Sequence, residues 1–228
     1  KRVPIGMGSR VEGRICGGLD SSYSNVVDKI TIASQGNAAN TSDLTEAVYN
    51  GAAMASSTRA ICAGGSPGSG EVNTIDYMTF GNDANFVDFG DLFDDRQSFG
   101  GCASPTRGVT MSGFDAPARV NYIEYITIST LGNGADFGDM IAARTPNQGV
   151  MSNAVRGLAF GGDVSANTGD RAGCASSTRA ILAFGTSASD TTVHYVNIMS
   201  QGDSLDFGDL FTGTYEFSGL SNGHGGLG

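Results

Sequence analysis

A four-residue motif recurs at a fixed distance along this chain of 228 residues. DFGD stands at residues 88–91, 136–139 and 206–209, and NTSD, at residues 40–43, lies 48 positions before the first of them. The closing aspartates are therefore 48, 48 and 70 positions apart. The runs KITIAS, DYMTFG, EYITIS and HYVNIM give the same three distances at Thr31, Thr79, Thr127 and Asn197. Two independent landmarks thus define a repeat of about 48 residues.

The DFG tripeptide also occurs in protein kinases, where its aspartate binds a catalytic magnesium ion. A kinase carries that aspartate once, together with a glycine-rich phosphate loop and an HRD motif. This chain has three copies of DFGD and neither of the companion motifs. We therefore interpret DFGD as part of a structural repeat rather than as a catalytic motif.

A third element combines an arginine with a following run of small and apolar residues that ends in glycine. Its copies are residues 57–65, 105–113, 154–162 and 177–185, with a looser copy at 8–18 and a degenerate one at 221–228. Arg156 and Arg179 are only 23 positions apart, whereas the preceding copies are separated by 48 or 49. Residues 163–176 therefore stand where a half-unit with the ITI and DFGD segments is expected.

Each unit contains strand-like segments separated by turn residues. NYIEYITIST has β-branched and aromatic residues on both alternating faces, which predicts a strand buried on both sides. LGNGADFGD predicts a turn, because glycine permits positive φ and Asn or Asp bonds its own backbone. RGLAFGG predicts a second strand. A repeat of about 40–50 residues with several short strands is typical of a propeller blade; a β-solenoid, the weaker alternative, has shorter coils.

The predicted fold is therefore all-β, a single β-propeller domain over residues 1–228. We predict blades of about 48 residues, five in number, with six as the alternative. The predicted units are 19–65, 66–113, 114–162, an irregular half-unit 163–185, and 186–228, and residues 1–18 form a partial strand of a closing or preceding blade.

Charge and hydropathy exclude several classes of partner. The formal net charge is −10, and the chain has two lysines, Lys1 and Lys29, so no basic cluster for nucleic-acid phosphates is visible. No apolar run of about 18 residues predicts a membrane span. The first ten residues, KRVPIGMGSR, lack the apolar core of a signal peptide.

The combination of YITIST, GNGADFGD, STRA and FGG resembles the kelch-like repeats of virion proteins in marine tailed phages, those of cyanophages especially. The closing SGLSNGHGGLG also resembles the C-terminal end of those proteins, and the resemblance covers the chain from about residue 8. It implies a β-propeller carried on the particle as a fibre, tail or capsid decoration component, and it brings no set of catalytic residues. Cellular kelch repeats also contain spaced tryptophans, and this chain has none.

Two sets of repeated polar residues are candidates for an ion-binding site. The aspartates of the three DFGD motifs offer clustered carboxylates for calcium, but we expect each to cap its own turn beside Gly90, Gly138 or Gly208. We expect the second set to tie strand ends to neighbouring carboxylates or carbonyls rather than to bind an anion; it comprises Arg59, Arg107, Arg156 and Arg179.

No sequence pattern supports nucleophilic catalysis or phosphate binding. His194 and His224 lie in unrelated contexts, and the glycine-rich residues 64–71 lack the lysine of a phosphate loop. We expect the cysteines to be free thiols, because equivalent points of adjacent repeats are normally a full unit apart in space; they are Cys16, Cys62, Cys102 and Cys174.

The resemblance and the residues together predict a non-enzymatic virion structural protein that also contributes to host-surface attachment. The alternative is a carbohydrate-binding or glycan-degrading propeller. A propeller glycosidase needs paired carboxylates in the central channel, and the strands expected to line it, RAICAGG and RGLAFGG, have no acids. We therefore expect no catalytic, cofactor-binding or metal-binding residues.

The expected partners are other virion proteins, further copies of the chain, and a host glycan or receptor, and the expected location is the virion, assembled in the host cytoplasm. Because residues 163–173 break the period, we expect them to form a specialised contact.

Overall fold

The computed structural model of the chain describes residues 4–146, 149–159, 171–184, 192–198 and 205–209. These residues form antiparallel β-sheets, and no helix occurs among them. In this part of the chain, accordingly, no helix is long and apolar enough to cross a membrane. The all-β prediction is confirmed.

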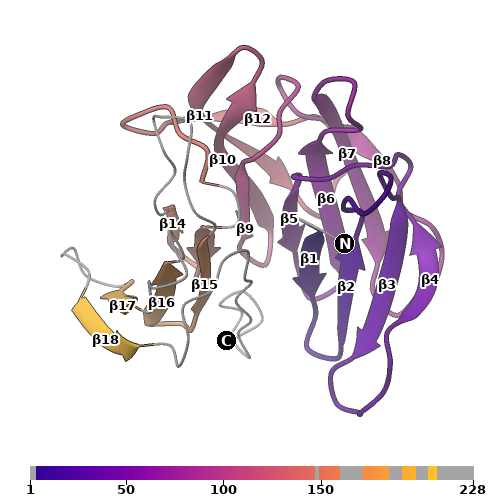
Figure 1. The fold of residues 1–228 in the computed structure, drawn as a ribbon, viewed down its shortest axis with the longest axis horizontal. Helices are drawn as coiled ribbons and strands as arrows, with labels where there is room; N and C mark the ends of the chain where they lie inside the picture. The colour runs from indigo at the N-terminus through magenta and orange to yellow at the C-terminus, as the bar shows by residue number, and fades with distance from the viewer. Residues whose placement is uncertain (1–3, 147–148, 160–170, 185–191, 199–204, 210–228) are drawn as a thin grey trace.

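Four of the sheets have four strands each and are called blades 1 to 4 (Figure 1). Blade 1 consists of β1 (Ile5–Gly8), β2 (Glu12–Cys16), β3 (Val26–Thr31) and β4 (Ala39–Asp43). Blade 2 consists of β5 (Ala52–Ala55), β6 (Arg59–Gly65), β7 (Val72–Thr79) and β8 (Val87–Asp91). Blade 3 consists of β9 (Gly100–Ala103), β10 (Arg107–Asp115), β11 (Ala118–Thr127) and β12 (Ala135–Asp139). Blade 4 consists of β15 (Arg171–Ala175), β16 (Arg179–Phe184), β17 (Thr192–Asn197) and β18 (Leu205–Asp209).

A fifth sheet has two strands, β13 (Val150–Ser152) and β14 (Gly157–Ala159), and is called the half-blade. The prediction of five or six blades is wrong, because the described residues contain four complete ones. The error comes from counting the arginine-containing element, because its copy at residues 154–162 supplies β14 of a sheet that has only two strands among the described residues. Residues 163–170 of the irregular segment lie outside the described residues.

The blades are arranged like those of a propeller. The first strands of consecutive sheets contact one another in the order β1, β5, β9, β13 and β15. Figure 1 shows these strands towards the middle of the molecule, whereas the fourth strands β4, β12 and β18 lie at its periphery. The strands that we expected to line the centre, RAICAGG and RGLAFGG, are instead second strands, β6 and β14. The predicted units 19–65, 66–113 and 114–162 therefore each combine the outer half of one blade with the inner half of the next sheet.

The DFGD motif forms the fourth strand of a blade rather than the predicted turn. In blade 2, Gly90 is opposite Ile75, and Asp88 is opposite Asp76, with a β-bulge between the two pairs. The same irregularity recurs between the third and fourth strands of the other blades. In blades 2, 3 and 4 the bulge places a glycine in a backbone conformation that other residues rarely adopt, whereas blade 1 has Ser42 at this position. The predicted positive φ is confirmed, at 143°, 133° and 137° for Gly90, Gly138 and Gly208.

The hydrophobic core lies mainly between neighbouring blades. Phe89 and Leu92 of blade 2 pack with Ile126 and Ile128 of blade 3 in one buried cluster. A second cluster joins blades 1 and 2, and a smaller one joins the half-blade to blade 4 through Met151 and Ile198. Complete burial of a large apolar side chain such as Phe89 stabilises the fold by about 1.5–3 kcal/mol. The contacts between blades, more than those within a sheet, therefore exclude water from the apolar side chains.

The four cysteines are free thiols, as predicted. The reason given for that prediction does not hold for the first pair, because Cys16 and Cys62 lie in the same buried cluster between blades 1 and 2. Burial raises the pKa of the Cys62 thiol well above its ordinary value, and a hydrogen bond with Cys16 acts in the same direction. The thiol is therefore protonated at neutral pH, and it packs as a small apolar side chain.

Candidate functional site

Neighbouring complete blades are joined by a repeated set of hydrogen bonds in which backbone N–H groups are the donors. At the contact between blades 2 and 3, the Asp91 N–H donates to the Asn133 side chain at 3.1 Å, and the Gly134 N–H donates to the Asp91 carbonyl at 2.7 Å. At the contact between blades 1 and 2, the Asp43 N–H donates to Asn85 at 3.1 Å. The 48-residue period thus repeats the bonds between blades as well as the strands within them.

An acidic residue of the third strand holds the loop that follows the fourth strand of the preceding blade. Glu124 accepts the Phe93 N–H at 2.5 Å. Asp76 accepts the Thr45 N–H at 2.9 Å and its hydroxyl at 2.7 Å. Burial raises the pKa of Asp76, and the two hydrogen bonds from Thr45 partly oppose that rise. Both carboxylates therefore serve the contact between blades rather than a catalytic site.

Two of the four repeated arginines make the predicted bond to a neighbouring carbonyl, and in both cases the carbonyl belongs to the next sheet. The Arg59 guanidinium donates to the Ile128 carbonyl at 2.6 Å, and that of Arg156 donates to the Ile198 carbonyl at 3.1 Å. Each arginine is positioned by a tight turn, in which the Ser56 or Asn153 side chain accepts the arginine N–H. These two guanidinium groups are committed to neighbouring carbonyls.

The other two arginines lie over tyrosine rings of their own blades. The guanidinium carbon of Arg107 is 4.4 Å from the centroid of the Tyr125 ring, and that of Arg179 is 4.8 Å from the Tyr195 ring. Arg59 makes the same contact with Tyr77 at 4.8 Å, in addition to its bond to blade 3. Stacking of the arginine on a tyrosine ring is therefore common to blades 2, 3 and 4. Of these three arginines, Arg59 also donates a hydrogen bond to a carbonyl of the next blade.

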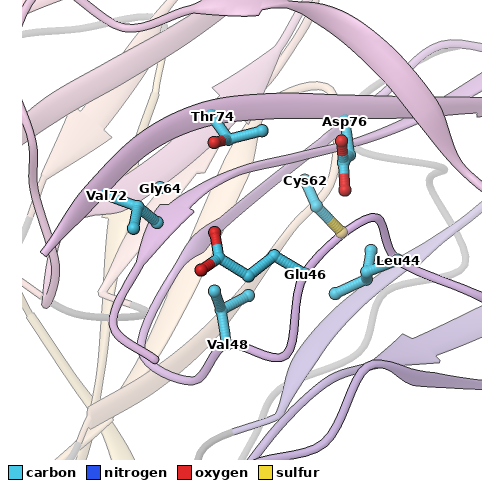
Figure 2. Close-up of a pocket in the computed structure, with 8 residues that line it drawn as sticks. All are labelled: Leu44, Glu46, Val48, Cys62, Gly64, Val72, Thr74 and Asp76. Carbon is cyan, nitrogen blue, oxygen red and sulfur yellow. The ribbon is translucent and has the colours of Figure 1, made fainter. Parts of the chain in front are cut away.

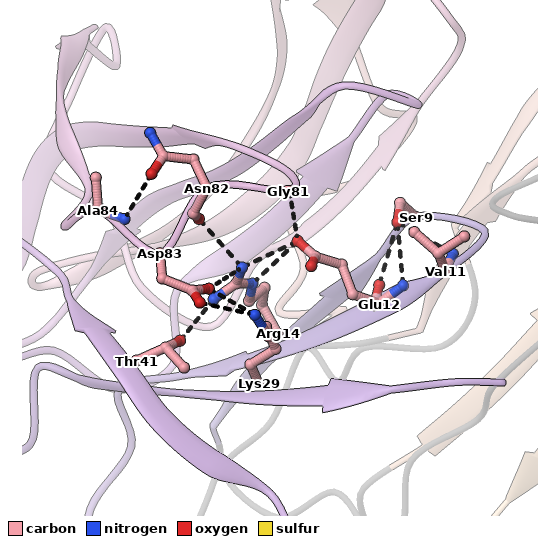
Figure 3. A network of polar contacts seen from close by, with 10 residues as sticks. All are labelled: Ser9, Val11, Glu12, Arg14, Lys29, Thr41, Gly81, Asn82, Asp83 and Ala84. Atoms are coloured by element: carbon pink, nitrogen blue, oxygen red, sulfur yellow. Dashed lines mark hydrogen bonds and ion pairs between the residues drawn. The ribbon is translucent and has the colours of Figure 1, made fainter. Parts of the chain in front are cut away.

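Blade 1 replaces this arginine with a network of charged residues (Figure 3). Glu12, at the position equivalent to Arg59, accepts the Gly81 N–H of blade 2 at 3.1 Å. The fully buried Arg14 pairs with Glu12 at 3.0 Å and with Asp83 at 3.1 Å. Asp83 also pairs with Lys29 at 2.7 Å, and this bond is the main reason that its pKa is lowered. The network therefore joins blades 1 and 2 through charged groups in both.

A second buried cation lies between blades 2 and 3. Arg96 is 0% exposed, forms an ion pair with Glu124 and donates to the Ser112 carbonyl at 3.0 Å. Its guanidinium carbon is 5.0 Å from the centroid of the Phe99 ring and 4.9 Å from that of Tyr122. Burial lowers the pKa of Arg96 to about 10, so the side chain remains charged at neutral pH. Its role is to neutralise Glu124 inside the contact between the blades.

A small cavity lies between blades 1 and 2, lined among others by Leu44, Val48, Cys62 and Asp76 (Figure 2). The volume open to solvent is about 10 Å³, which is room for about one water molecule. Ligand pockets have volumes of about 300–1,000 Å³. The cavity is therefore a packing defect beside the buried Asp76 carboxylate and does not serve as a substrate pocket.

The candidate functional site is an exposed aromatic face on blade 3, formed by Arg107, Tyr125 and Phe137 and called the blade 3 face. The Tyr125 and Phe137 rings meet edge to face with their centroids 6.0 Å apart. Phe137 is 53% exposed, although the equivalent Phe89 of blade 2 is 3% exposed. Blade 4 has a similar exposed pair in Tyr195 and Phe207, at 6.1 Å. The blade 3 face offers a partner both an apolar surface and an exposed guanidinium group.

The aspartates that we considered as calcium ligands make local bonds. The N–H groups of the three bulge glycines each donate to the first aspartate of their DFGD motif, at 3.0, 2.9 and 3.0 Å; these aspartates are Asp88, Asp136 and Asp206. The second aspartate of the blade 2 motif contributes its backbone to the contact between blades, since the Asp91 N–H donates to the Asn133 side chain. Among the described residues, no three His, Cys, Asp or Glu side chains group together in a way that could hold a metal ion.

The remaining sequence candidates give no site. His194 is half-buried on β17 at the position equivalent to Asp76 and Glu124, while His224 lies outside the described residues. Sequence reasoning missed the acidic residues of the third strands and the turn residues Asn85 and Asn133. The signal was present, because each pair is 48 positions apart. It could not indicate that the partner atoms belong to the preceding blade.

No protein-family model matches this sequence, and a search among curated proteins finds no match. The fold does match solved structures. One of them, described as "Structure of YjhT", superimposes on 92% of this chain with a TM-score of 0.58 and 7% sequence identity. The present chain spans 66% of the length of that YjhT chain. At this identity the similarity shows the fold alone, and it supports the propeller-like arrangement of the blades.

Proposed function

We propose that the protein is a non-enzymatic structural component of a phage virion that binds other particle proteins through the blade 3 face and contributes to host-surface attachment. The observation that carries this proposal is the exposure of Phe137 beside Tyr125 and Arg107, whereas the equivalent Phe89 of blade 2 is buried. Exposed apolar patches of this kind are typical of protein interaction surfaces. The similarity of the repeat motifs to virion proteins indicates the type of assembly.

The inner strands support a role without catalysis. The first strands of the five described sheets are IGMG, AAMA, GGCA, VMS and RAGCA, and none of them contains Asp or Glu. A retaining or inverting glycosidase needs two carboxyl groups about 5–10 Å apart across the scissile bond. The lack of acidic residues, which was expected of RAICAGG and RGLAFGG, therefore also holds for the first strands that lie at the centre. It favours a binding role over glycan degradation.

The proposal is tested on particles rather than on the isolated chain. Purified virions from a phage that encodes this protein are analysed by quantitative mass spectrometry, and we expect the polypeptide in several copies per particle. Its display on the particle in many copies would multiply weak contacts through avidity. Absence from the particles, with the protein present in the infected cell, would exclude the structural role.

A second candidate function is carbohydrate binding without catalysis, and the blade 3 face favours it over glycan degradation. An exposed aromatic pair next to a guanidinium offers both an apolar surface and hydrogen-bond donors to a sugar ring. A glycan array probed with the wild type and with Phe137→Ser separates this possibility from protein binding. Glycan binding that the substitution removes would support this second function.

A further inference from the structure

Among the residues that the structure describes, the half-blade has two strands, whereas each complete blade has a further outer pair. From the end of β6 at Gly65 to the start of β9 at Gly100 the chain has 35 positions, and from Asp115 to Val150 it again has 35. These stretches contain the outer hairpins of blades 2 and 3. From the end of β14 at Ala159 to the start of β15 at Arg171 there are 12 positions. This connection has fewer residues than the outer hairpin of blade 3, which extends from residue 118 to residue 139.

The contact between blades 2 and 3 shows what an outer hairpin does for the face that it covers. Ile126 and Ile128 of the hairpin pack on Phe89, which becomes almost completely buried. The hairpin also supplies Glu124 as acceptor for the Phe93 N–H, the Asn133 side chain as acceptor for the Asp91 N–H, and the Ile128 carbonyl as acceptor for Arg59. One hairpin therefore satisfies both the apolar and the polar groups of the preceding blade.

The same groups are present on blade 3 without such a cover. Phe137 takes the place of Phe89 and is 53% exposed. In the part of the chain that the structure describes, no acceptor bonds the Ile141 N–H, which is equivalent to that of Phe93. The Arg107 guanidinium, equivalent to that of Arg59, contacts aromatic rings but bonds no carbonyl in these described regions. Blade 3 thus exposes the same groups that blade 2 uses in its contact with blade 3.

We propose that the blade 3 face binds a β-hairpin from a different protein chain, which docks as the missing outer half of the half-blade. The chemistry of the hairpin is set by the covered contact: a carboxylate followed at two-residue spacing by two aliphatic residues, as in Glu124, Ile126 and Ile128, and then a turn containing asparagine. This inference rests on the proposed function, since it specifies how a particle protein would be held. Recognition by strand docking is a general mode of protein assembly.

A second copy of this chain is a less suitable occupant. Each outer hairpin that the structure describes is already hydrogen-bonded to the second strand of its own blade. Such a hairpin would have to leave its blade before it could dock, or it would bring its inner strands into the place of β13 and β14. A hairpin from another protein that is not paired with inner strands can dock without leaving a blade and without overlapping β13 and β14.

The experiment uses the full chain and a fluorescently labelled synthetic peptide with the sequence of residues 118–139, which is the natural cover of the equivalent face. We expect saturable binding by fluorescence anisotropy with one high-affinity site. Phe137→Ser and, separately, Arg107→Met are each expected to weaken binding by about tenfold or more, since truncation of a central aromatic or arginine anchor commonly has that effect. The matched control is Phe207→Ser, which removes the equally exposed phenylalanine of blade 4 and is expected to leave the high-affinity site unchanged.

Changes in the peptide test the proposed chemistry from the other side. A peptide with Ile126→Asn and Ile128→Asn is expected to lose binding, and Glu124→Gln to weaken it. Circular dichroism and the melting temperature of each protein variant establish that it is folded. No saturable binding, or binding that only Phe207→Ser removes, would overturn the proposal. Sedimentation that shows a dimer dissociated by Phe137→Ser would overturn it in favour of a second copy. None of these outcomes depends on the particle analysis, so the two proposals fail separately.

Discussion

The contact between blades 2 and 3 and the contact between blade 3 and the half-blade start from nearly the same sequence and end in different structures. VDFGDLF and ADFGDMI both form a bulged fourth strand with a glycine at φ near 140°. The first phenylalanine is buried under Ile126 and Ile128, and the second stands half-exposed. The environment of a repeated residue is therefore set by the unit that follows it. A position in this repeat can be structural in one copy and available for binding in another.

The largest expected difference concerns the two phenylalanines. Phe89→Ala removes a buried ring from the core cluster, and we expect it to lower the free energy of unfolding by about 3–5 kcal/mol. Phe137→Ala removes a half-exposed ring, and we expect a loss below about 1 kcal/mol. Urea denaturation followed by intrinsic fluorescence gives both values. Similar losses for the two variants would mean that the blade 3 face is covered in solution.

The bulge glycines give a second comparison. Gly90→Ala and Gly138→Ala both place a side chain at positive φ, at a cost of about 1–3 kcal/mol each. A Cβ atom on Gly90 would lie 2.6 Å from the backbone of Gly132 in blade 3, whereas one on Gly138 meets nothing within 4 Å. We therefore expect Gly90→Ala to destabilise the protein by at least about 1 kcal/mol more than Gly138→Ala, because the clash adds to the strain. Thermal unfolding of the two variants side by side measures the difference. Equal effects would show that strain alone acts.

A third comparison uses the arginines. Arg59→Met removes the bond to the Ile128 carbonyl together with the contact on Tyr77, and we expect it to cost about 1–2 kcal/mol. Arg107→Met removes the contact on Tyr125, which is worth about 0.5–1 kcal/mol at an exposed site. The pair is compared by chemical denaturation. A larger cost for Arg107→Met would contradict the assignment of the bond between blades to Arg59 alone.

The smallest expected effect is a pH dependence at the contact between blades 1 and 2. Burial raises the pKa of Asp76 in the folded protein above its unfolded value of about 3.9. The folded state then holds this proton more tightly than the unfolded chain does, so the stabilisation is complete below the unfolded pKa and is lost as the pH rises through the folded pKa. Denaturation midpoints measured from pH 3.5 upward should fall more steeply for the wild type than for Asp76→Asn. Parallel curves would show that Asp76 does not titrate in this way.

The sequence predicted the period, the all-β class and the propeller-like arrangement, because 48-residue spacing and alternating residues report on the strands of one blade. It also predicted positive φ at Gly90, because the same DFGD segment with its glycine occurs three times. The blade count failed because residues 154–162 match the arginine-containing element but supply an inner strand only. A motif copy shows that a strand is present and does not show that its sheet is complete.

The contacts between blades were less predictable than the strands. Arg96 is buried against Glu124, yet the equivalent position in the preceding unit is Val48, which lines the small cavity near Asp76. Nothing local to Arg96 distinguishes it from an exposed arginine, since its partner lies 28 positions away on another sheet. The exposure of Phe137 was equally hidden, because it depends on the next sheet, which has only β13 and β14 among the described residues. Both features depend on which sheets face one another, and periodicity alone does not carry that information.

The inner row of strands continues through the half-blade, while the outer layer is interrupted there. Bending stiffness in a layered structure depends most on the material far from the bending axis. At the half-blade, the described residues form only the two short strands β13 and β14, near the centre. Blades 1 to 3, bonded to one another over their whole width, are expected to move together as one stiff plate. In the described part of the chain, blade 4 is joined to that plate through the half-blade, which we expect to be a line of mechanical compliance. A hairpin docked on the blade 3 face would act as a brace across that line, and it would set the angle at which blade 4 is held.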